Sequence, residues 1–179
     1  MNPRPVVAID PGRNSGIAWL VPVKGGSGVS VTIATRAVKV PSEVGGLSAV
    51  RLAVDMAATA ILAAGFRLDE VEVVVEIQHV RFAAAALVVT EVRRTWEVYA
   101  FERFGIMPAQ VHPSEWRSRF GLNKVKAGGK KDAARDVLDA VISGQGWVFE
   151  AYSRDRKRTE DECEAALMAL GRLGVCYAG

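Results

Sequence analysis

VVAIDPG, residues 6–12, is the stretch that decides the fold, because a wholly apolar run ends there in a carboxylate and a turn. Such a run is typical of a central strand buried on both faces, and Pro11 with Gly12 favours a turn directly after it. Asp10 is therefore expected at the C-terminal end of a buried strand. A carboxylate is costly in this apolar setting unless a cation meets it, so further carboxylates converging on Asp10 would indicate a divalent metal site. The plain alternative is an ordinary turn residue.

Two more strands are predicted directly after this turn. Residues 16–21 form an apolar run, and residues 29–37 alternate in the manner of a strand with one outward face. The glycine-rich segment 24–28 between them is typical of a turn. The first part of the chain is therefore expected to be a three-stranded antiparallel meander.

A second acidic strand is predicted after a crossover helix. Residues 47–64 carry apolar side chains at helical spacing, and Gly65 is a natural stop. Residues 71–77 are again strongly β-prone, and a strand that follows a crossover helix runs parallel to the first strand. This geometry would bring Glu76 close to Asp10. The plain alternative is a charge on an edge strand. Of the candidate acids in this chain, Glu76 is the hardest to explain in such plain terms, because it is a single carboxylate within a buried run.

The remainder reads as helices and one short strand, so the fold class is α/β with a mixed five-stranded sheet flanked by helices. Nothing in composition suggests a linker, and residues 1–179 are expected to form a single domain. The predicted elements are a helix over 84–104 with Trp96 and Tyr99 in its core stripe, a strand over 110–112, a helix beginning at 113–116 with Ser114 as its N-cap, a helix over 131–142, and a last helix carrying Asp161 and Glu164.

The last helix is expected to present two carboxylates at one spot. Asp161 and Glu164 are spaced i,i+3 and share a face. Glu160 lies i,i+4 from Glu164 and competes with Asp161 for the same role, with register favouring Asp161. Acidic residues in a first helical turn can also do no more than complement the helix dipole. The sequence positions alone do not decide whether these acids bind a metal ion or only complement the helix dipole.

Positive charge is unevenly distributed, although the net charge is only +3. Residues 115–135 carry seven cationic side chains against two acidic ones, and a second basic cluster occupies residues 154–158 just before the last helix. A solvated loop is the ordinary explanation of such runs. Two basic loops that flank an acidic constellation nevertheless suit a phosphate backbone better than a small neutral substrate.

Composition places the chain among soluble intracellular proteins. Half of the residues are hydrophobic, but no apolar stretch approaches the roughly 20 residues of a membrane span, and the N-terminus is too short for a signal peptide's apolar segment. Cys163 and Cys176 have neither disulfide nor zinc spacing, so a small hydrophobic role is expected. The predicted location is the cytoplasm, and no membrane partner is expected.

The ordered set of motifs resembles the RuvC-like Holliday-junction resolvases of the ribonuclease-H superfamily. The match spans residues 6–174 and rests on four segments: Ile9-Asp10-Pro11-Gly12-x-x-x-Gly16, Val74-Val75-Glu76, Lys131-x4-Asp136-Val137-Leu138 and the acidic, Ala/Leu-rich run over 161–170. The resemblance implies a ribonuclease-H-like fold and a structure-selective endonuclease that resolves four-way DNA junctions. Glu164 stands where the family usually has Asp, and Arg117 stands where it often has Lys.

What the resemblance implies about the site is a set of metal ligands, one functional lysine and a DNA-contacting group. Two Mg²⁺ or Mn²⁺ ions would be held by Asp10, Glu76, Asp161 and Glu164. Lys131 would act near the scissile phosphate. The implied DNA contacts are Arg13, His79, Phe82, Arg117, Lys124, Lys126 and Lys130. Either His79 or Phe82 would stack on an opened base.

Two symmetric cuts in a two-fold junction imply a homodimer, and the second face of the helix over 84–104, with Leu87, Ala100 and Phe101, is the candidate interface. Other readings remain: a superfamily nuclease with a different substrate, such as branched DNA, a flap or RNA, or a catalytically silent nucleic-acid-binding protein. An actin-like ATPase would need further phosphate-binding glycine loops late in the chain, so no nucleotide cofactor is expected.

Overall fold

The computed structural model describes residues 4–12, 14–23, 31–40, 46–77, 83–125, 130–145 and 159–177, excepting the side chains of residues 46, 83–87, 130, 131 and 145. Its centre is a five-stranded sheet in the order β3-β2-β1-β4-β5. The strands are β1 (Val6–Asp10), β2 (Asn14–Pro22), β3 (Val31–Lys39), β4 (Glu72–Glu76) and β5 (Ala109–Val111).

The strand pairing confirms the predicted mixed sheet. The β1–β2 and β2–β3 pairs are antiparallel, whereas the β1–β4 and β4–β5 pairs are parallel. Strand β4 therefore lies between β1 and β5, and the edge-strand explanation of Glu76 is wrong. Strand β4 is buried from its second residue on. It has a paired strand on each side, and helices cover both faces of the sheet.

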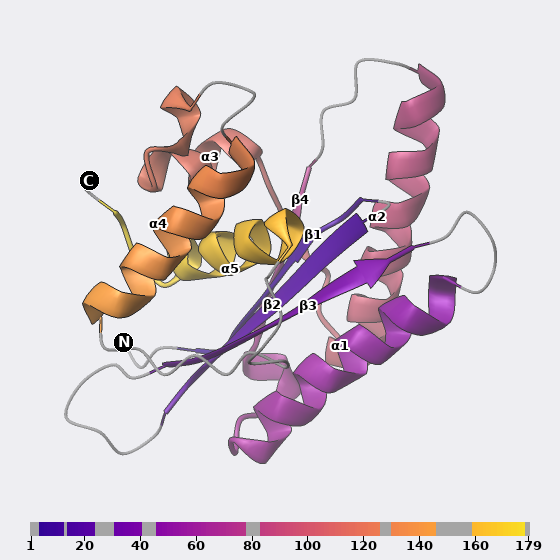
Figure 1. Ribbon diagram of the computed structural model, residues 1–179. Coiled ribbons are helices and arrows are strands. Elements are labelled where there is room, and N and C mark those ends of the chain that lie inside the picture. Colours follow the sequence, from indigo (N-terminus) through magenta and orange to yellow (C-terminus); the bar gives the residue numbers. More distant parts are fainter. Residues whose placement is uncertain are drawn as a thin grey trace.

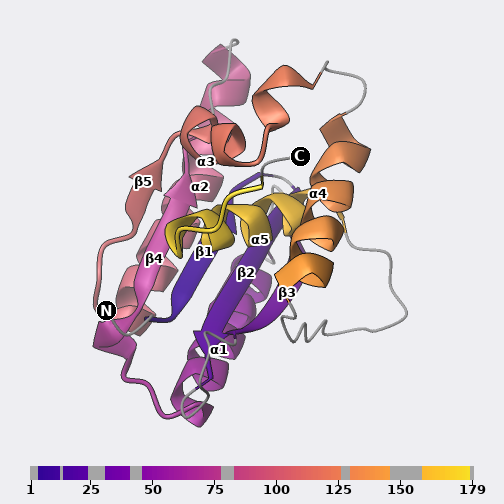
Figure 2. The same cartoon turned by 90° about the vertical axis from the view of Figure 1, so that its left-hand side faces the viewer.

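Helices cover both faces of the sheet, as Figures 1 and 2 show. Helices α1 (Gly46–Ala63) and α2 (Ala83–Phe104) lie on one face. On the other lie α3 (Pro113–Arg119), α4 (Lys130–Gln145) and α5 (Glu160–Arg172), together with the short 3-10 helix η2 (Leu122–Lys124). A second 3-10 turn, η1 (Leu68–Glu70), leads into β4. Among the described residues, no helix is long and apolar enough to cross a membrane.

Strand alternation divides the interior into two apolar clusters. Val7 and Ile9 of β1 pack with α1 and α2, whereas Val6 and Ala8 pack with α5. The same alternation turns even-numbered residues of β1 and β4 toward α5. This parity matters for the site, because Asp10 is an even-numbered position at the end of β1.

Helix α5 is the most deeply buried element on its face. Its residues 162–171 are all buried, and it packs across β2, β1 and β3. A helix with small, apolar side chains on almost every side suits such an interior position. Cys163 is fully buried, as the sequence predicts. Figure 2 shows α5 lying across the front of β1 and β2.

The start of α3 differs from the sequence prediction. His112 is the N-cap, and its Nδ1 atom accepts a hydrogen bond from the backbone N–H of Ser114 at 3.3 Å. Ser114 is therefore the second residue of the helix, and its hydroxyl lies 2.7 Å from the same ring nitrogen. Pro113 occupies the first helical position, where its missing N–H costs nothing, which makes the residue before it the cap.

The proposed partner-facing side of α2 also needs correction. Ala100 is fully buried in the cluster that contains Trp96, so it cannot contribute to an exposed interface. Phe101 is 46% exposed, and Val98, three residues earlier, is 53% exposed. The side chain of Leu87 lies outside the described part. Trp96 is buried in the core and the half-buried Tyr99 packs against it, in line with their predicted place in the core stripe.

Candidate active site

Asp10 and Glu76 lie at the carboxyl ends of two neighbouring parallel strands. Ile9 of β1 is paired with Val75 of β4, so the next residues along, Asp10 and Glu76, are neighbours in the sheet. Both belong to the register that faces α5, and their exposed fractions are only 3% and 4%. The predicted proximity of these two carboxylates is therefore confirmed by the strand register.

Helix α5 begins directly above the same end of the sheet. Gly16 of β2 is the pairing partner of Asp10, and a Cβ atom built on Gly16 would lie 2.0 Å from the carbonyl oxygen of Asp161. Only a residue without a side chain permits this approach of helix backbone to strand backbone. The first turn of α5 is thus placed beside Asp10 by the glycine at the end of the opening motif.

A capping box fixes the first turn of α5. The Thr159 hydroxyl accepts from the Glu162 N–H at 3.3 Å, and Glu162 Oε2 accepts from the Thr159 N–H at 2.9 Å. The hydroxyl of Thr35 on β3 donates to the other oxygen of Glu162 at 3.4 Å. Glu162 is therefore a buried cap residue, which the Thr-x-x-Glu spacing would have allowed the sequence reading to identify.

Glu164 is held by a cation from another helix. Nη2 of Arg117 on α3 lies 2.8 Å from each carboxylate oxygen of Glu164, and only 8% of Glu164 is exposed. Burial raises the pKa of Glu164 from its ordinary 4.5 to about 7, an effect that Arg117 opposes and that the nearby charges of Glu76 and Glu160 reinforce. Glu164 is thus electrostatically linked to the strand carboxylates.

Glu76 has its own donor on α3. Nε1 of Trp116 donates to Glu76 Oε2 at 2.7 Å inside the protein. Burial raises the pKa of Glu76, while this hydrogen bond and the charges of Arg117 and His112 lower it in part. The sequence reading missed Trp116 as a site residue. The tryptophan itself was the available signal, because the indole N–H of a buried tryptophan requires an acceptor.

Two consecutive residues of α3 therefore hold two of the carboxylates: Trp116 binds Glu76, and Arg117 binds Glu164. The guanidinium carbon of Arg117 also lies 5.1 Å from the centre of the Trp116 ring, which is a cation–π distance. Because α3 follows β5 without a long connection, the sheet itself sets the position of Trp116 and Arg117.

The turn after Asp10 is anchored from the opposite face of the sheet. The fully buried Ser15 hydroxyl donates to the Gly12 carbonyl at 2.6 Å and accepts from the Gly12 N–H at 3.0 Å. Nε1 of Trp96 on α2 donates to the same hydroxyl at 3.1 Å. A buried three-way network thus fixes the backbone that leaves Asp10.

Two solved structures share this architecture over nearly the whole chain. T. thermophilus RuvC in complex with Holliday junction substrate aligns with a TM-score of 0.58 and 16% identity, covering 96% of this chain and 98% of that chain. A second Thermus thermophilus RuvC structure aligns with a TM-score of 0.56 and 19% identity over the same shares. The chain has the RuvC fold. No family model matches the sequence, and no curated protein matches it either.

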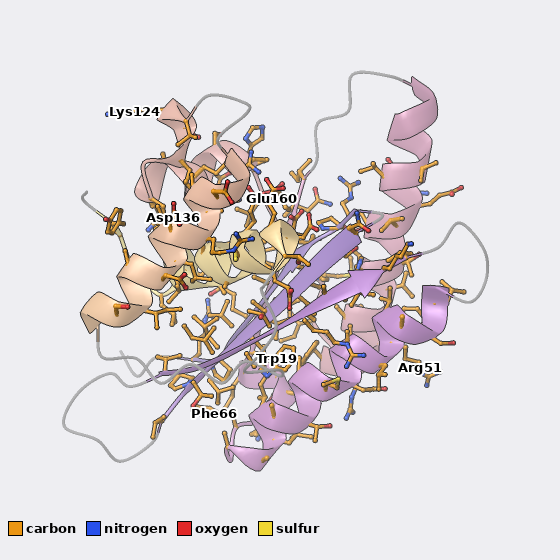
Figure 3. The ribbon with its side chains drawn as sticks, viewed as in Figure 1. Trp19, Arg51, Phe66, Lys124, Asp136 and Glu160 are labelled. Atoms are coloured by element: carbon orange, nitrogen blue, oxygen red, sulfur yellow. The ribbon has the colours of Figure 1, made fainter. Side chains whose placement is uncertain are left out.

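On this RuvC fold, a mixed ribonuclease-H-like sheet flanked by helices, the acidic residues predicted from the sequence meet at one end of the sheet. Asp10, Glu76 and Glu164 are buried there, and Asp161 is placed beside Asp10 by its backbone contact with Gly16. Glu160 is near enough to raise the pKa of Glu164, so the choice between Asp161 and Glu160 stays open. Figure 3 shows Glu160 at the start of α5.

The donor set is all carboxylate oxygen, which suits Mg²⁺ or Mn²⁺ better than zinc. In the described part of the chain, however, no three acidic, His or Cys residues are grouped tightly enough to hold a metal ion as they stand. Glu164 has both oxygens on Arg117, and Glu76 has one oxygen on Trp116. The chemistry of these oxygens therefore fits a hard divalent ion, although the described positions of the side chains do not by themselves form a metal-binding group.

Of the predicted basic residues whose side chains the structure describes, Arg117 lies against the acids and Lys124 does not. Lys124 is exposed at the end of η2, and Figure 3 shows it projecting outward, away from Glu160. Lys130 and Lys131 belong to the first turn of α4, with side chains outside the described part. The remaining predicted contacts, Arg13, His79, Phe82 and Lys126, lie outside the described residues, as does the 154–158 cluster.

Proposed function

We propose that this protein is a metal-dependent endodeoxyribonuclease that resolves four-way DNA junctions by paired cuts. The observation that carries the proposal is the meeting of buried carboxylates from β1, β4 and α5 at one end of a RuvC-fold sheet. Buried acids with raised pKa values and a specific cationic partner are typical of functional sites.

The residues divide the work of phosphodiester hydrolysis between them. Asp10, Glu76, Glu164 and Asp161 would hold two Mg²⁺ or Mn²⁺ ions, with Asp10 between the other ligands. When bound, such ions lower the pKa of an attacking water and stabilise the departing oxygen. Trp116 fixes the carboxylate of Glu76, and the Ser15 network fixes the backbone after Asp10. Lys131, in the first turn of α4, would act near the scissile phosphate.

DNA binding would rest on the basic residues around the acidic site. Arg117 suits a phosphate because its planar guanidinium forms two parallel hydrogen bonds. Arg13, Lys124, Lys126 and Lys130 would add backbone contacts, whose sum makes binding salt-dependent. His79 or Phe82 would stack on an unpaired base at the branch point.

A homodimer is part of the proposal, because a two-fold junction is matched by a two-fold protein. The exposed side chains of Val98 and Phe101 on α2 give the interface an apolar centre in place of Ala100. Sedimentation at micromolar concentration is expected to give a dimer mass. A purely monomeric protein at that concentration would contradict both the interface and paired cutting.

The deciding experiment is cleavage of a labelled immobile four-way junction beside linear duplex, a flap and an RNA–DNA hybrid, with Mg²⁺, Mn²⁺ or EDTA. Paired nicks in the junction that need metal and disappear in Asp10→Asn are the expected result. Preferential cutting of another substrate would assign a different nuclease activity. Binding without cutting of any substrate would leave a nucleic-acid-binding protein.

A further inference from the structure

Arg117 occupies both carboxylate oxygens of Glu164 with hydrogen bonds. One nitrogen of Arg117 lies 2.8 Å from both Oε1 and Oε2, and the carboxylate is buried. A metal ion at either oxygen would lie close to the guanidinium and place two cations side by side, so it would compete electrostatically with Arg117 for the same carboxylate. Glu164 is therefore expected to bind a metal ion more readily when Arg117 moves away.

Arg117 is incompletely held where it lies. Its Nε atom is buried, and nothing in the described part of the chain accepts a hydrogen bond from it. The Arg117 side chain is still 23% exposed, so it lies at the border between the acidic site and the outside. A guanidinium in this position is suited to exchange its carboxylate for a phosphate, which offers bidentate geometry.

The charges favour exchange over simple addition. Arg117 attracts both Glu76 and Glu164, so it offsets part of the negative charge of this acidic pair. A divalent ion among the carboxylates would take over that balance, and a DNA phosphate would provide Arg117 with a new anionic partner. Both changes separate cations that would otherwise repel each other.

We propose that Arg117 is an exchangeable counter-ion of Glu164 that moves to a backbone phosphate when DNA docks and thereby releases Glu164 to bind a divalent metal ion. This inference rests on the proposed function, since it takes nucleic acid and metal as the two ligands. It makes their binding cooperative through a single residue, and the coupling is reciprocal.

The first test measures Mn²⁺ binding to the DNA-free protein by isothermal titration calorimetry. Arg117→Ala is expected to bind Mn²⁺ about tenfold more tightly than wild type, because the competing cation is gone. Arg117→Lys, which keeps the charge, is expected to stay close to wild type. The matched control is Arg119→Ala, two residues further along α3, whose guanidinium instead donates to the Gly171 carbonyl at 3.2 Å.

Equal or weaker Mn²⁺ binding by Arg117→Ala would overturn the proposal, because it would mean that Arg117 supports the ligand. The same holds if Arg117→Lys binds as tightly as Arg117→Ala. Circular dichroism melting monitors folding of each variant, and Arg117→Gln replaces Arg117→Ala if the alanine variant does not fold.

The second test measures coupling with DNA. Anisotropy of a fluorescent four-way junction is followed at 4 °C with and without Mn²⁺, and gels of the recovered DNA verify that it is uncut. Wild type is expected to gain about tenfold in DNA affinity from Mn²⁺, and Arg117→Ala to gain less than about twofold. Unchanged coupling in the variant would overturn the proposal. Failure of the proposed function appears separately, as intact coupling without junction cleavage.

Discussion

The backbone of Asp161 rests directly on Gly16, so closely that a single methyl group on that glycine would lie 2.0 Å from the Asp161 carbonyl oxygen. This contact joins the first acidic motif of the chain to the last, although 145 positions separate the two residues in the sequence. The opening motif therefore contributes a carboxylate at Asp10 and, six residues later, the surface on which the final helix lies.

Gly16→Ala is expected to destabilise the protein by about 3 kcal/mol, because the clash is with helix backbone and no side-chain rotation relieves it. Chemical denaturation measures the loss. Gly144→Ala in α4 is the control, since a Cβ there meets nothing within 4 Å and alanine favours a helix. An equally stable Gly16→Ala variant would contradict the described packing of α5 on β2.

Trp116→Phe is expected to weaken Mn²⁺ binding by about 10- to 100-fold, the usual effect of removing a hydrogen bond that orients a metal ligand. The substitution removes the N–H that Glu76 accepts while keeping an aromatic ring in the core. Trp19→Phe makes the same change in the apolar cluster on the α1 side of the sheet, and calorimetry should give wild-type affinity for it. Similar losses in both variants would indicate a general packing effect.

The contribution of Glu164 to the stability of the metal-free protein is expected to fall as pH rises from about 4.5 to about 7. The folded state raises the pKa of Glu164 to about 7, so the folded state binds more protons than the unfolded state in this window. The stabilising protonation is complete below the unfolded pKa and is lost as pH rises through the folded one. The free energy of unfolding of wild type minus that of Glu164→Gln, measured by urea titration, should therefore fall across the window. A rising difference would mean that Arg117 outweighs burial.

Ser15→Ala is expected to cost about 1–3 kcal/mol, because it leaves the buried indole N–H of Trp96 and the N–H of Gly12 without their acceptor. The exposed Ser118, which donates to the Glu115 carbonyl, provides the matched serine-to-alanine control. Ser118→Ala should change the free energy of unfolding by less than about 0.5 kcal/mol. Equal effects of the two substitutions would contradict a special role for the Ser15 network.

The elements that the sequence predicted correctly are those with a clear hydrophobic periodicity and a clear turn or stop residue at their end. Apolar runs and a crossover helix were sufficient to predict that β1 and β4 are parallel neighbours, and strand parity then places Asp10 beside Glu76. The same reasoning succeeded for the buried stripe of α5 around Cys163. Local patterns were informative here because burial and periodicity act along the chain.

The contacts that the sequence did not disclose are made between distant segments. Trp116 read as part of an ordinary helix start, and Arg117 was predicted as a DNA contact without its carboxylate partner. Nothing nearby in the chain indicates that they contact Glu76 and Glu164. Ala100 read as surface because helical spacing alone does not say how wide a buried stripe is. The cap of α3 was misplaced by two residues because a histidine, rarely a cap, precedes the proline.

The burial of α5 has a consequence for the order in which the protein becomes competent during synthesis. Strands β1 and β4 contribute their two carboxylates within the first 76 residues, but the remaining acids arrive only from residue 160 onward, on a helix that must pack against three strands. A ribosome-bound chain that has folded only its sheet would hold Asp10 and Glu76 but none of the acids of α5. Docking of this one helix would then complete both the acidic site and the core on its side of the sheet, so the site would form only when that core is closed.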